Sequence, residues 1–204
     1  MSSFDSQLFS GIAEKVYSQG YCVIENALPN ELAISLLERV KNLEPNSFKD
    51  AGVGRKNEYA KHEDIRQDQI FWIDGICETE KSWLEWTSLL QQAINQQLFL
   101  GLFSYESHFA HYKKGEFYKK HVDAFRGQSN RKLSTVTYLN PEWDSGDGGE
   151  LLIYSEQGDQ VIEKVMPHLG TLVVFLSEVF PHEVLPATQD RFSIAGWFRV
   201  NEGL

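Results

Sequence analysis

The segment His121-Val122-Asp123 places an imidazole and a carboxylate two positions apart in a stretch that we expect to be extended. Side chains alternate between the two faces of a strand, so both groups would point to the same side and could chelate one ion. The pair alone is a weak signal, because six histidines and 29 acidic residues make an accidental match common. A solvated surface pair is the simple alternative.

A third candidate ligand, His182, lies much later in the chain, in the segment Phe180 to Val184. In a closed double sheet, a distant strand can return beside the first and bring this imidazole to the same ion. Two histidines and one carboxylate on one face of a metal leave further coordination positions open, as non-haem iron(II) oxygenases require. Zinc, which favours a tetrahedral site with at most one open position, is the second choice.

Arg191 precedes a stretch, Phe192 to Trp197, that alternates into the predicted core. An arginine that points inward there needs an anionic partner, because an unpaired buried charge is costly. Its planar guanidinium can bind a carboxylate with two parallel hydrogen bonds, which suits the distal end of 2-oxoglutarate. The alternative is a structural ion pair with Asp190 or Glu183.

Apolar residues that recur with the helical period predict three helices: from near the start to Gly20, from Pro29 to Leu43, and from Thr79 to Leu98. Tyr21 to Ile24 reads as a short strand. The segment Glu44 to Lys61 lacks periodicity and is expected to be a long loop. These elements form the predicted helical support for the site.

After Gly101 the pattern changes to short β-branched and aromatic runs separated by Gly, Pro, Asn and Asp. The predicted strands are Ser104 to Tyr112, Leu133 to Leu139, Leu151 to Tyr154, Val161 to Val165, Thr171 to Leu176, Glu183 to Leu185 and Phe192 to Val200. Helices followed by strands indicate an α+β fold, with N-terminal helices against an antiparallel double sheet of the jelly-roll or cupin type, a double-stranded β-helix.

The chain has 204 residues, of which 42% are hydrophobic, so one sizeable core is expected. We therefore predict a single domain over 1–204, with helical support in 1–100 and the jelly-roll core in 101–204. Nineteen basic against 29 acidic residues give a formal charge of −10. This charge disfavours nucleic acids and anionic membranes as partners.

No stretch approaches the roughly 20 apolar residues of a membrane span. The opening residues lack the basic start and apolar run of a secretion signal. The two cysteines, Cys22 and Cys77, have no metal or redox spacing and are expected to be reduced. A cytoplasmic protein is the expectation.

The chain from about Gly20 to Val200 resembles the 2-oxoglutarate oxygenases of the prolyl hydroxylase type, in particular the hypoxia-inducible-factor prolyl hydroxylases and their bacterial relatives. The resemblance rests on these stretches: Asp64 to Trp72, His121-Val122-Asp123, Thr137 to Asn140 followed by Glu142-Trp143, and Pro181 to Val184 leading to Arg191.

The resemblance implies that Tyr138 donates a hydrogen bond to the same distal carboxylate as Arg191, that Tyr112 lies near the iron-chelating end, and that Trp197 walls the pocket. Four further positions match the surroundings of the substrate groove: Arg131, Arg66, Asp68 and Trp72. The segment Glu44 to Lys61 matches a mobile loop that closes over a bound peptide. Ordinary aromatic core is the alternative for the tyrosines and tryptophans.

The function implied by the resemblance is hydroxylation of a prolyl residue in a protein, with iron(II), 2-oxoglutarate and dioxygen, release of succinate and carbon dioxide, and ascorbate as a candidate reductant. The bacterial relatives suggest elongation factor Tu as the substrate. Hydroxylation of a free amino acid or other small molecule is one alternative, and a non-catalytic cupin-like metal- and ligand-binding module is another. The sequence does not determine the oligomeric state.

Overall fold

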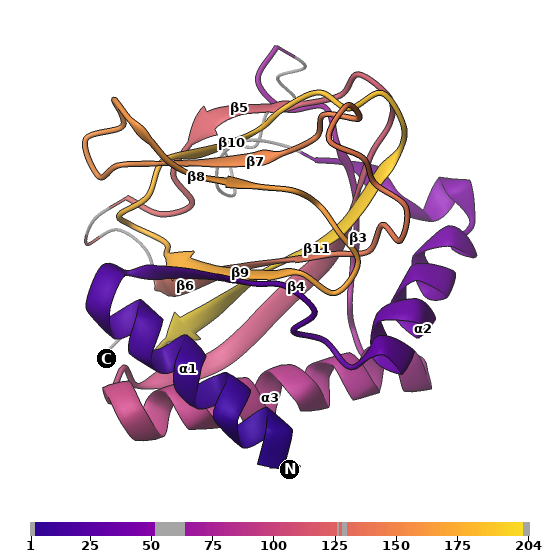
Figure 1. Cartoon of the computed structure of the whole chain (residues 1–204). Coiled ribbons are helices and arrows are strands. Elements are labelled where there is room, and N and C mark those ends of the chain that lie inside the picture. The colour runs from indigo at the N-terminus through magenta and orange to yellow at the C-terminus, as the bar shows by residue number, and fades with distance from the viewer. Residues whose placement is uncertain (1–2, 52–63, 126, 128–129, 202–204) are drawn as a thin grey trace.

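Two antiparallel sheets face each other, and helices cover the outer face of the larger one (Figure 1). The structure is a computed structural model that describes residues 3–51, 64–125, 127 and 130–201. The larger sheet has the strand order β1-β9-β6-β11-β4-β3-β2, and the smaller one has the order β5-β10-β7-β8. This arrangement is the double-stranded β-helix that the succession of helices and strands predicts.

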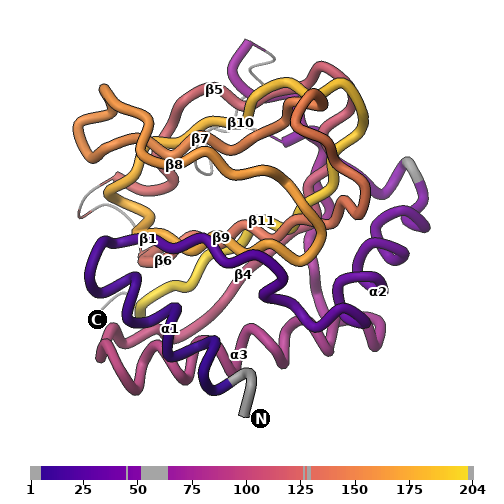
Figure 2. Tube along the Cα trace, viewed as in Figure 1, coloured from indigo at the N-terminus to yellow at the C-terminus, as the bar shows by residue number. Residues whose placement is uncertain are grey.

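The strands occupy these residues: β1 Tyr21–Ile24, β2 Lys49–Asp50, β3 Gln69–Trp72, β4 Leu102–Tyr112, β5 Tyr118–His121, β6 Arg131–Tyr138, β7 Leu151–Tyr154, β8 Val161–Val165, β9 Leu172–Leu176, β10 His182–Val184 and β11 Arg191–Val200. Sequence neighbours are seldom neighbours in a sheet. Strand β1 runs beside β9 although most of the chain separates them (Figure 2). The site is therefore assembled from distant segments.

Three α-helices support the larger sheet: α1 Ser3–Gln19, α2 Asn30–Lys41 and α3 Glu78–Leu98. Helix α1 ends before Gly20, whose φ of +82° is a left-handed conformation that glycine adopts without strain. Helices α1 and α3 pack together beneath the sheet, and α2 packs against α3 (Figure 1).

The structure adds two strands that the sequence did not predict, β2 and β3, which extend the larger sheet beyond β4. A 3-10 turn at Pro45–Ser47 and β2 occupy part of the segment expected to be a loop. Residues 52–63 of that segment lie outside the described residues. Strand β3 escaped prediction, although its four residues, QIFW, equal β1 and β7 in length.

Two apolar clusters lie on opposite faces of the larger sheet. One fills the space between helices and sheet and includes Phe9, Trp83 and Phe109. The other lies between the two sheets and includes Ala110 and Phe175. Alternation along β4 explains the split, because Phe109 faces the helices and Ala110 faces the smaller sheet. The site residues described below belong to the inter-sheet side.

Trp83 joins α3 to β4 and should contribute strongly to stability. Its side chain is fully buried, and its indole N–H donates to Ser107 Oγ at 3.1 Å. We expect Trp83→Ala to lower the free energy of unfolding by about 3–5 kcal/mol, measured by urea denaturation. The control Tyr17→Ala removes a helical aromatic that is 82% exposed, and a change below about 0.5 kcal/mol is expected. Equal losses in both variants would contradict this packing role.

Candidate metal centre and cosubstrate pocket

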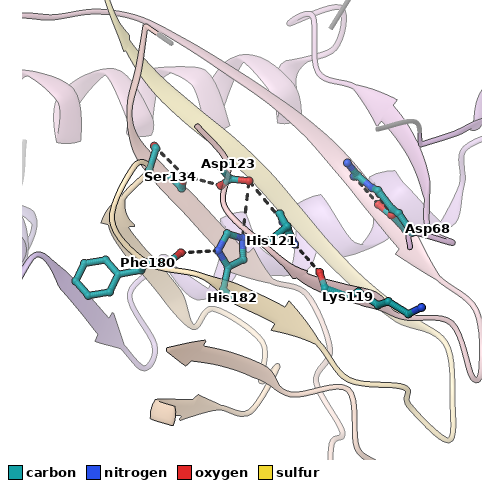
Figure 3. A network of polar contacts seen from close by, with 9 residues as sticks. Asp68, Lys119, His121, Asp123, Ser134, Phe180 and His182 are labelled. Atoms are coloured by element: carbon teal, nitrogen blue, oxygen red, sulfur yellow. Dashed lines mark hydrogen bonds and ion pairs between the residues drawn. The ribbon is translucent and has the colours of Figure 1, made fainter. Parts of the chain in front are cut away.

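Antiparallel pairing of β10 with β5 sets His182 directly opposite His121. Asp123 follows β5 and turns toward both rings (Figure 3). Its Oδ1 lies 3.7 Å from His121 Nε2 and 3.8 Å from His182 Nε2. Both separations are less than twice a metal–ligand bond of about 2.1 Å, so one ion can reach each pair of atoms. The three predicted ligands therefore form a group that could hold a metal.

The reason for this convergence differs in one respect from the sequence argument. Strand β5 ends at His121, so Asp123 does not share a strand face with it. The chain bends after the strand, and the Asp123 carboxylate returns to the same side. The Ser134 hydroxyl on β6 donates to Asp123 Oδ2 at 2.6 Å, and Ser134 Oγ also lies 2.9 Å from Ser177 Oγ. Contact with the facing sheet thus fixes the carboxylate.

Backbone carbonyls orient both imidazoles. His121 Nδ1 lies 2.8 Å from the Lys119 carbonyl oxygen, and His182 Nδ1 lies 3.0 Å from that of Phe180 (Figure 3). A carbonyl only accepts, so each Nδ1 carries the hydrogen and each Nε2 keeps its lone pair. That is the tautomer with which a histidine binds a metal through Nε2.

The charge states of the group also suit a cation. Burial lowers the pKa of His182 to about 4, with a further contribution from His121, so its imidazole is neutral near pH 7. Burial alone would raise the pKa of Asp123, but the two histidines and the Ser134 hydroxyl hold it well below its usual range. The site therefore offers one carboxylate and a neutral imidazole.

The group lies in a cavity of about 60 Å³ between the two sheets. Arg191 lines the same cavity, at the first position of β11 and opposite Tyr112 on β4. Arg191 is 1% exposed, and its side chain is among the largest that are fully buried in the described residues. Among the described residues, neither its Nε nor its Nη1 has a hydrogen-bond partner. A buried cation with free donors indicates that an anion belongs in this cavity.

The alternative ion pairs expected for Arg191 do not form. Asp190 lies 2.9 Å from His111 Nε2 and accepts from the Lys114 backbone N–H, and Glu183 accepts from the Tyr154 hydroxyl. These carboxylates are therefore engaged elsewhere.

Two tyrosines frame the guanidinium of Arg191. Its Cζ lies 4.9 Å from the ring centre of Tyr112 and 5.0 Å from that of Tyr138. The Tyr138 hydroxyl is buried and has no partner among the described residues. Burial raises the pKa of both phenols, so both remain protonated donors. Arg191 and Tyr138 thus present buried hydrogen-bond donors close to each other.

Of the four residues expected near the substrate groove, Arg66 and Asp68 line the same cavity, whereas Arg131 and Trp72 do not. Arg66 and Asp68 line it and form a two-pronged ion pair, at 2.6 and 2.8 Å. Trp197 also lines it, and the Arg131 guanidinium stacks on the Trp197 ring at 3.7 Å. Trp72 on β3 does not line the cavity; its side chain is 42% exposed. In the structure Arg66 is thus paired with Asp68, and Arg131 is stacked on Trp197.

Sequence reasoning missed Ser134 and Tyr118, which contact the candidate ligands. The Tyr118 ring stacks on the His121 ring at 3.5 Å. Tyr118 begins the strand that ends at His121, so its closeness in the sequence could have suggested this contact. Ser134 carried no such signal, because only the packing of β6 beside the smaller sheet brings it to Asp123.

Comparison with known proteins agrees with this geometry. The model of the 2OG-Fe(II) oxygenase superfamily matches residues 107–199. A crystal structure of a Pseudomonas putida prolyl-4-hydroxylase is 38% identical, with a TM-score of 0.85, and covers 95% of this chain and 99% of its own. The chain belongs to the 2-oxoglutarate- and iron(II)-dependent oxygenases of the prolyl hydroxylase type. It is therefore an oxidoreductase that uses iron(II), 2-oxoglutarate and dioxygen.

Animal members of the prolyl hydroxylase family are also similar. Prolyl hydroxylase EGLN3 of Mus musculus is 28% identical over 195 residues, covering 90% of this chain and 80% of that protein. Human Egl nine homolog 1 is 30% identical over 190 residues, and the match spans 43% of its length. A Trichoplax adhaerens prolyl hydroxylase, solved with a hypoxia inducible factor peptide fragment, has a TM-score of 0.86 at 27% identity and covers 98% of this chain and 94% of its own. Among the described residues, none of the helices has the length and apolar character needed to cross a membrane.

A further histidine, His108, is buried beside the site. It lies on β4 between the rings of Trp72 and Trp197, at 5.0 and 5.4 Å, and is 1% exposed. Neither ring nitrogen has a partner among the described residues. Burial, aided by the charge of Arg66, lowers its pKa to about 3. The folded protein therefore keeps this imidazole neutral in mildly acidic solution.

This low pKa predicts a pH-dependent loss of stability. Unfolding frees His108 to take up a proton near its ordinary pKa of about 6.5, so the free energy of unfolding should fall as the pH falls below that value. We expect His108→Leu to reduce this slope by up to about 1.4 kcal/mol per pH unit in urea denaturation between about pH 6 and 4. The control His168→Leu removes an exposed histidine and should keep the wild-type slope. An unchanged slope in His108→Leu would refute the prediction.

Proposed function

We propose that this prolyl hydroxylase modifies a prolyl residue in a protein substrate, with elongation factor Tu as the candidate. One observation carries the assignment of the site: Arg191 is buried, two of its nitrogens have no partner among the described residues, and it shares a cavity with His121, Asp123 and His182. A metal group alone would suit many proteins. The added anion site matches a keto acid with a distal carboxylate.

In this proposal His121, Asp123 and His182 are the iron ligands. The donor set of two imidazoles and one carboxylate suits iron(II) with positions left for other ligands. Each donor is supported: carbonyl oxygens fix the two rings, and Ser134 fixes the carboxylate. These supports make the group ready to bind without rearrangement.

In this proposal Arg191 and Tyr138 hold the distal carboxylate of 2-oxoglutarate, and Tyr112, whose ring lies 4.9 Å from the guanidinium, serves the iron-chelating end. When bound, iron, 2-oxoglutarate and dioxygen supply the oxidising chemistry, which yields succinate, carbon dioxide and a hydroxylated substrate. The residues of the chain orient the cosubstrate and keep bulk water away, since Tyr112 and Trp197 are almost fully buried. Ascorbate is a candidate reductant that keeps the iron ferrous.

The proposed place for the prolyl residue is the part of the cavity near Arg66, Asp68 and Trp197, whose ring the Arg131 guanidinium covers. A related prolyl hydroxylase from Trichoplax adhaerens was solved with a peptide fragment, which supports a polypeptide substrate here. The similarity to a Pseudomonas putida prolyl-4-hydroxylase supports a bacterial type of substrate. We take elongation factor Tu as the candidate. A cytoplasmic location accords with that substrate and with the free thiols of both cysteines.

Arg191 should govern the affinity for 2-oxoglutarate. We expect Arg191→Gln to raise the KM for 2-oxoglutarate about 100-fold or more, because it removes one partner of a buried charge pair. Arg191→Lys keeps the charge but loses the fork, so a smaller increase of about tenfold is expected. Succinate formation measures both. The control Arg199→Gln removes an arginine of the same strand that pairs with Glu106, and its KM should remain near the wild-type value.

The substrate proposal is tested by mass spectrometry of purified elongation factor Tu after incubation with enzyme, iron(II), 2-oxoglutarate and ascorbate in air. We expect one proline-containing peptide to gain the mass of one oxygen atom, with succinate formed in equal amount. His182→Ala, which removes a proposed iron ligand, should give no addition. A modified residue other than proline, or succinate formation without any modification of the protein, would contradict the proposal.

A further inference from the structure

The candidate metal ligands differ in how firmly the sheet holds them. Strand β10 lies inside the smaller sheet, paired on both sides, and His182 packs edge-on against the Phe175 ring at 4.7 Å. Strand β5 is an edge strand with four residues. His121, at its end, has a sheet neighbour on one side alone. Its ring therefore needs support from outside the sheet.

That support comes from a row of three side chains. The Tyr118 ring lies parallel to the His121 ring, with 3.5 Å between centroids and 14° between planes. The Arg66 guanidinium lies over the Tyr118 ring, with its Cζ 4.7 Å from the ring centre. Asp68 accepts two hydrogen bonds from that guanidinium, at 2.6 and 2.8 Å.

The backbone fixes where the row stands. Lys119 N–H donates to the Ile65 carbonyl at 2.9 Å, and Gln67 N–H donates to the Phe117 carbonyl at 3.2 Å. These contacts and the bridge between Arg66 and Tyr118 bind the segment before β3 to β5. Burial makes the row rigid, because Asp68 is 1% exposed and the Arg66 side chain 14% exposed. A solvent-exposed ion pair would be looser.

We propose that Asp68, Arg66 and Tyr118 form a positioning stack that holds the His121 imidazole in the orientation for metal binding. The inference rests on the proposed role of His121 as an iron ligand. It gives Arg66 and Asp68, expected from the sequence to serve the substrate, an effect on the metal that exists before any substrate binds. The ring of Tyr118, rather than its hydroxyl, is the active part.

The physical basis is that a ligand held in place loses little freedom when the ion arrives. The Lys119 carbonyl fixes one point of the His121 ring, and stacking restrains the tilt of its plane. Removal of partners that orient a metal ligand costs about 10–100-fold in metal affinity in well-studied sites. A role confined to substrate contact would leave metal affinity untouched.

The test is an anaerobic cobalt(II) titration without cosubstrate or substrate, followed by the visible absorption of the bound ion. We expect Tyr118→Leu to weaken cobalt binding about tenfold or more and to alter the absorption band. Tyr118→Phe keeps the ring and should bind within about twofold of wild type. Arg66→Gln should weaken binding to a smaller degree, because the stack remains but loses its outer support. Near-ultraviolet circular dichroism confirms that each variant is folded.

The matched control is Arg39→Gln, which removes an arginine from another partly buried carboxylate pair, Arg39–Glu80 at 2.9 Å. Its cobalt affinity should equal that of the wild type. Wild-type affinity in Tyr118→Leu, or equal losses in Tyr118→Phe and Tyr118→Leu, would overturn the stack. If Tyr118→Leu does not fold, wild-type affinity in Arg66→Gln overturns it.

The same titration separates this inference from the ligand assignment. If His121→Ala binds cobalt as the wild type does, His121 is not a ligand and the proposed function fails together with the stack. If His121→Ala loses the metal while both stack variants retain it, the stack alone is wrong. A loss in all of them, with Arg39→Gln unchanged, supports both.

Discussion

The pairing of β5 with β10 is the constraint on which the site depends. It sets His182 opposite His121, although about sixty residues of chain lie between them in a sheet-forming sequence. A shift by one residue would turn one imidazole to the other face of the sheet, because side chains alternate with a period of two. The register of this pairing shifts between His182 and Val184, but His182 and His121 remain direct partners.

The site combines rigid apolar packing with a few buried polar groups that have no partner among the described residues. Around the cavity, Phe175 and Val184 belong to the core between the sheets. Arg191, which lines the cavity, and the buried Tyr138 beside it present donors that no described residue satisfies. Such groups destabilise the empty protein, and an anionic ligand compensates by pairing with them. Stability and cosubstrate binding are therefore linked at the same residues.

The larger sheet serves the site in two ways. On its helix-facing side, Phe109 packs in the same core as Trp83 of α3, and its opposite side supplies Arg191 to the cavity and Ser134 to the Asp123 carboxylate. Strand β3 brings the segment with Arg66 against the smaller sheet, so the edge of one sheet stabilises a ligand on the other. The metal group is thus held from both layers.

Prediction from the sequence succeeded where the signal was local. The helical period placed α1, α2 and α3 to within a few residues, and β1, β7 and β8 had the predicted bounds. It failed for β2 and β3, which extend the sheet from the edge of β4: β3 pairs with β4, and the two-residue β2 pairs with β3. It also gave the wrong reason for the proximity of His121 and Asp123, since β5 ends between them.

The sequence by itself determined the residue types of the site: two histidines, one aspartate and an inward arginine whose charge required a partner. It also indicated the layered fold, because local periodicity decides which face of each element is buried. The tertiary structure alone decided that Arg191 has no carboxylate partner among the described residues, that Ser134 orients Asp123, and that Arg66 stacks on Tyr118. These relations depend on contacts between residues far apart in the chain, and local sequence patterns carry no record of such distances.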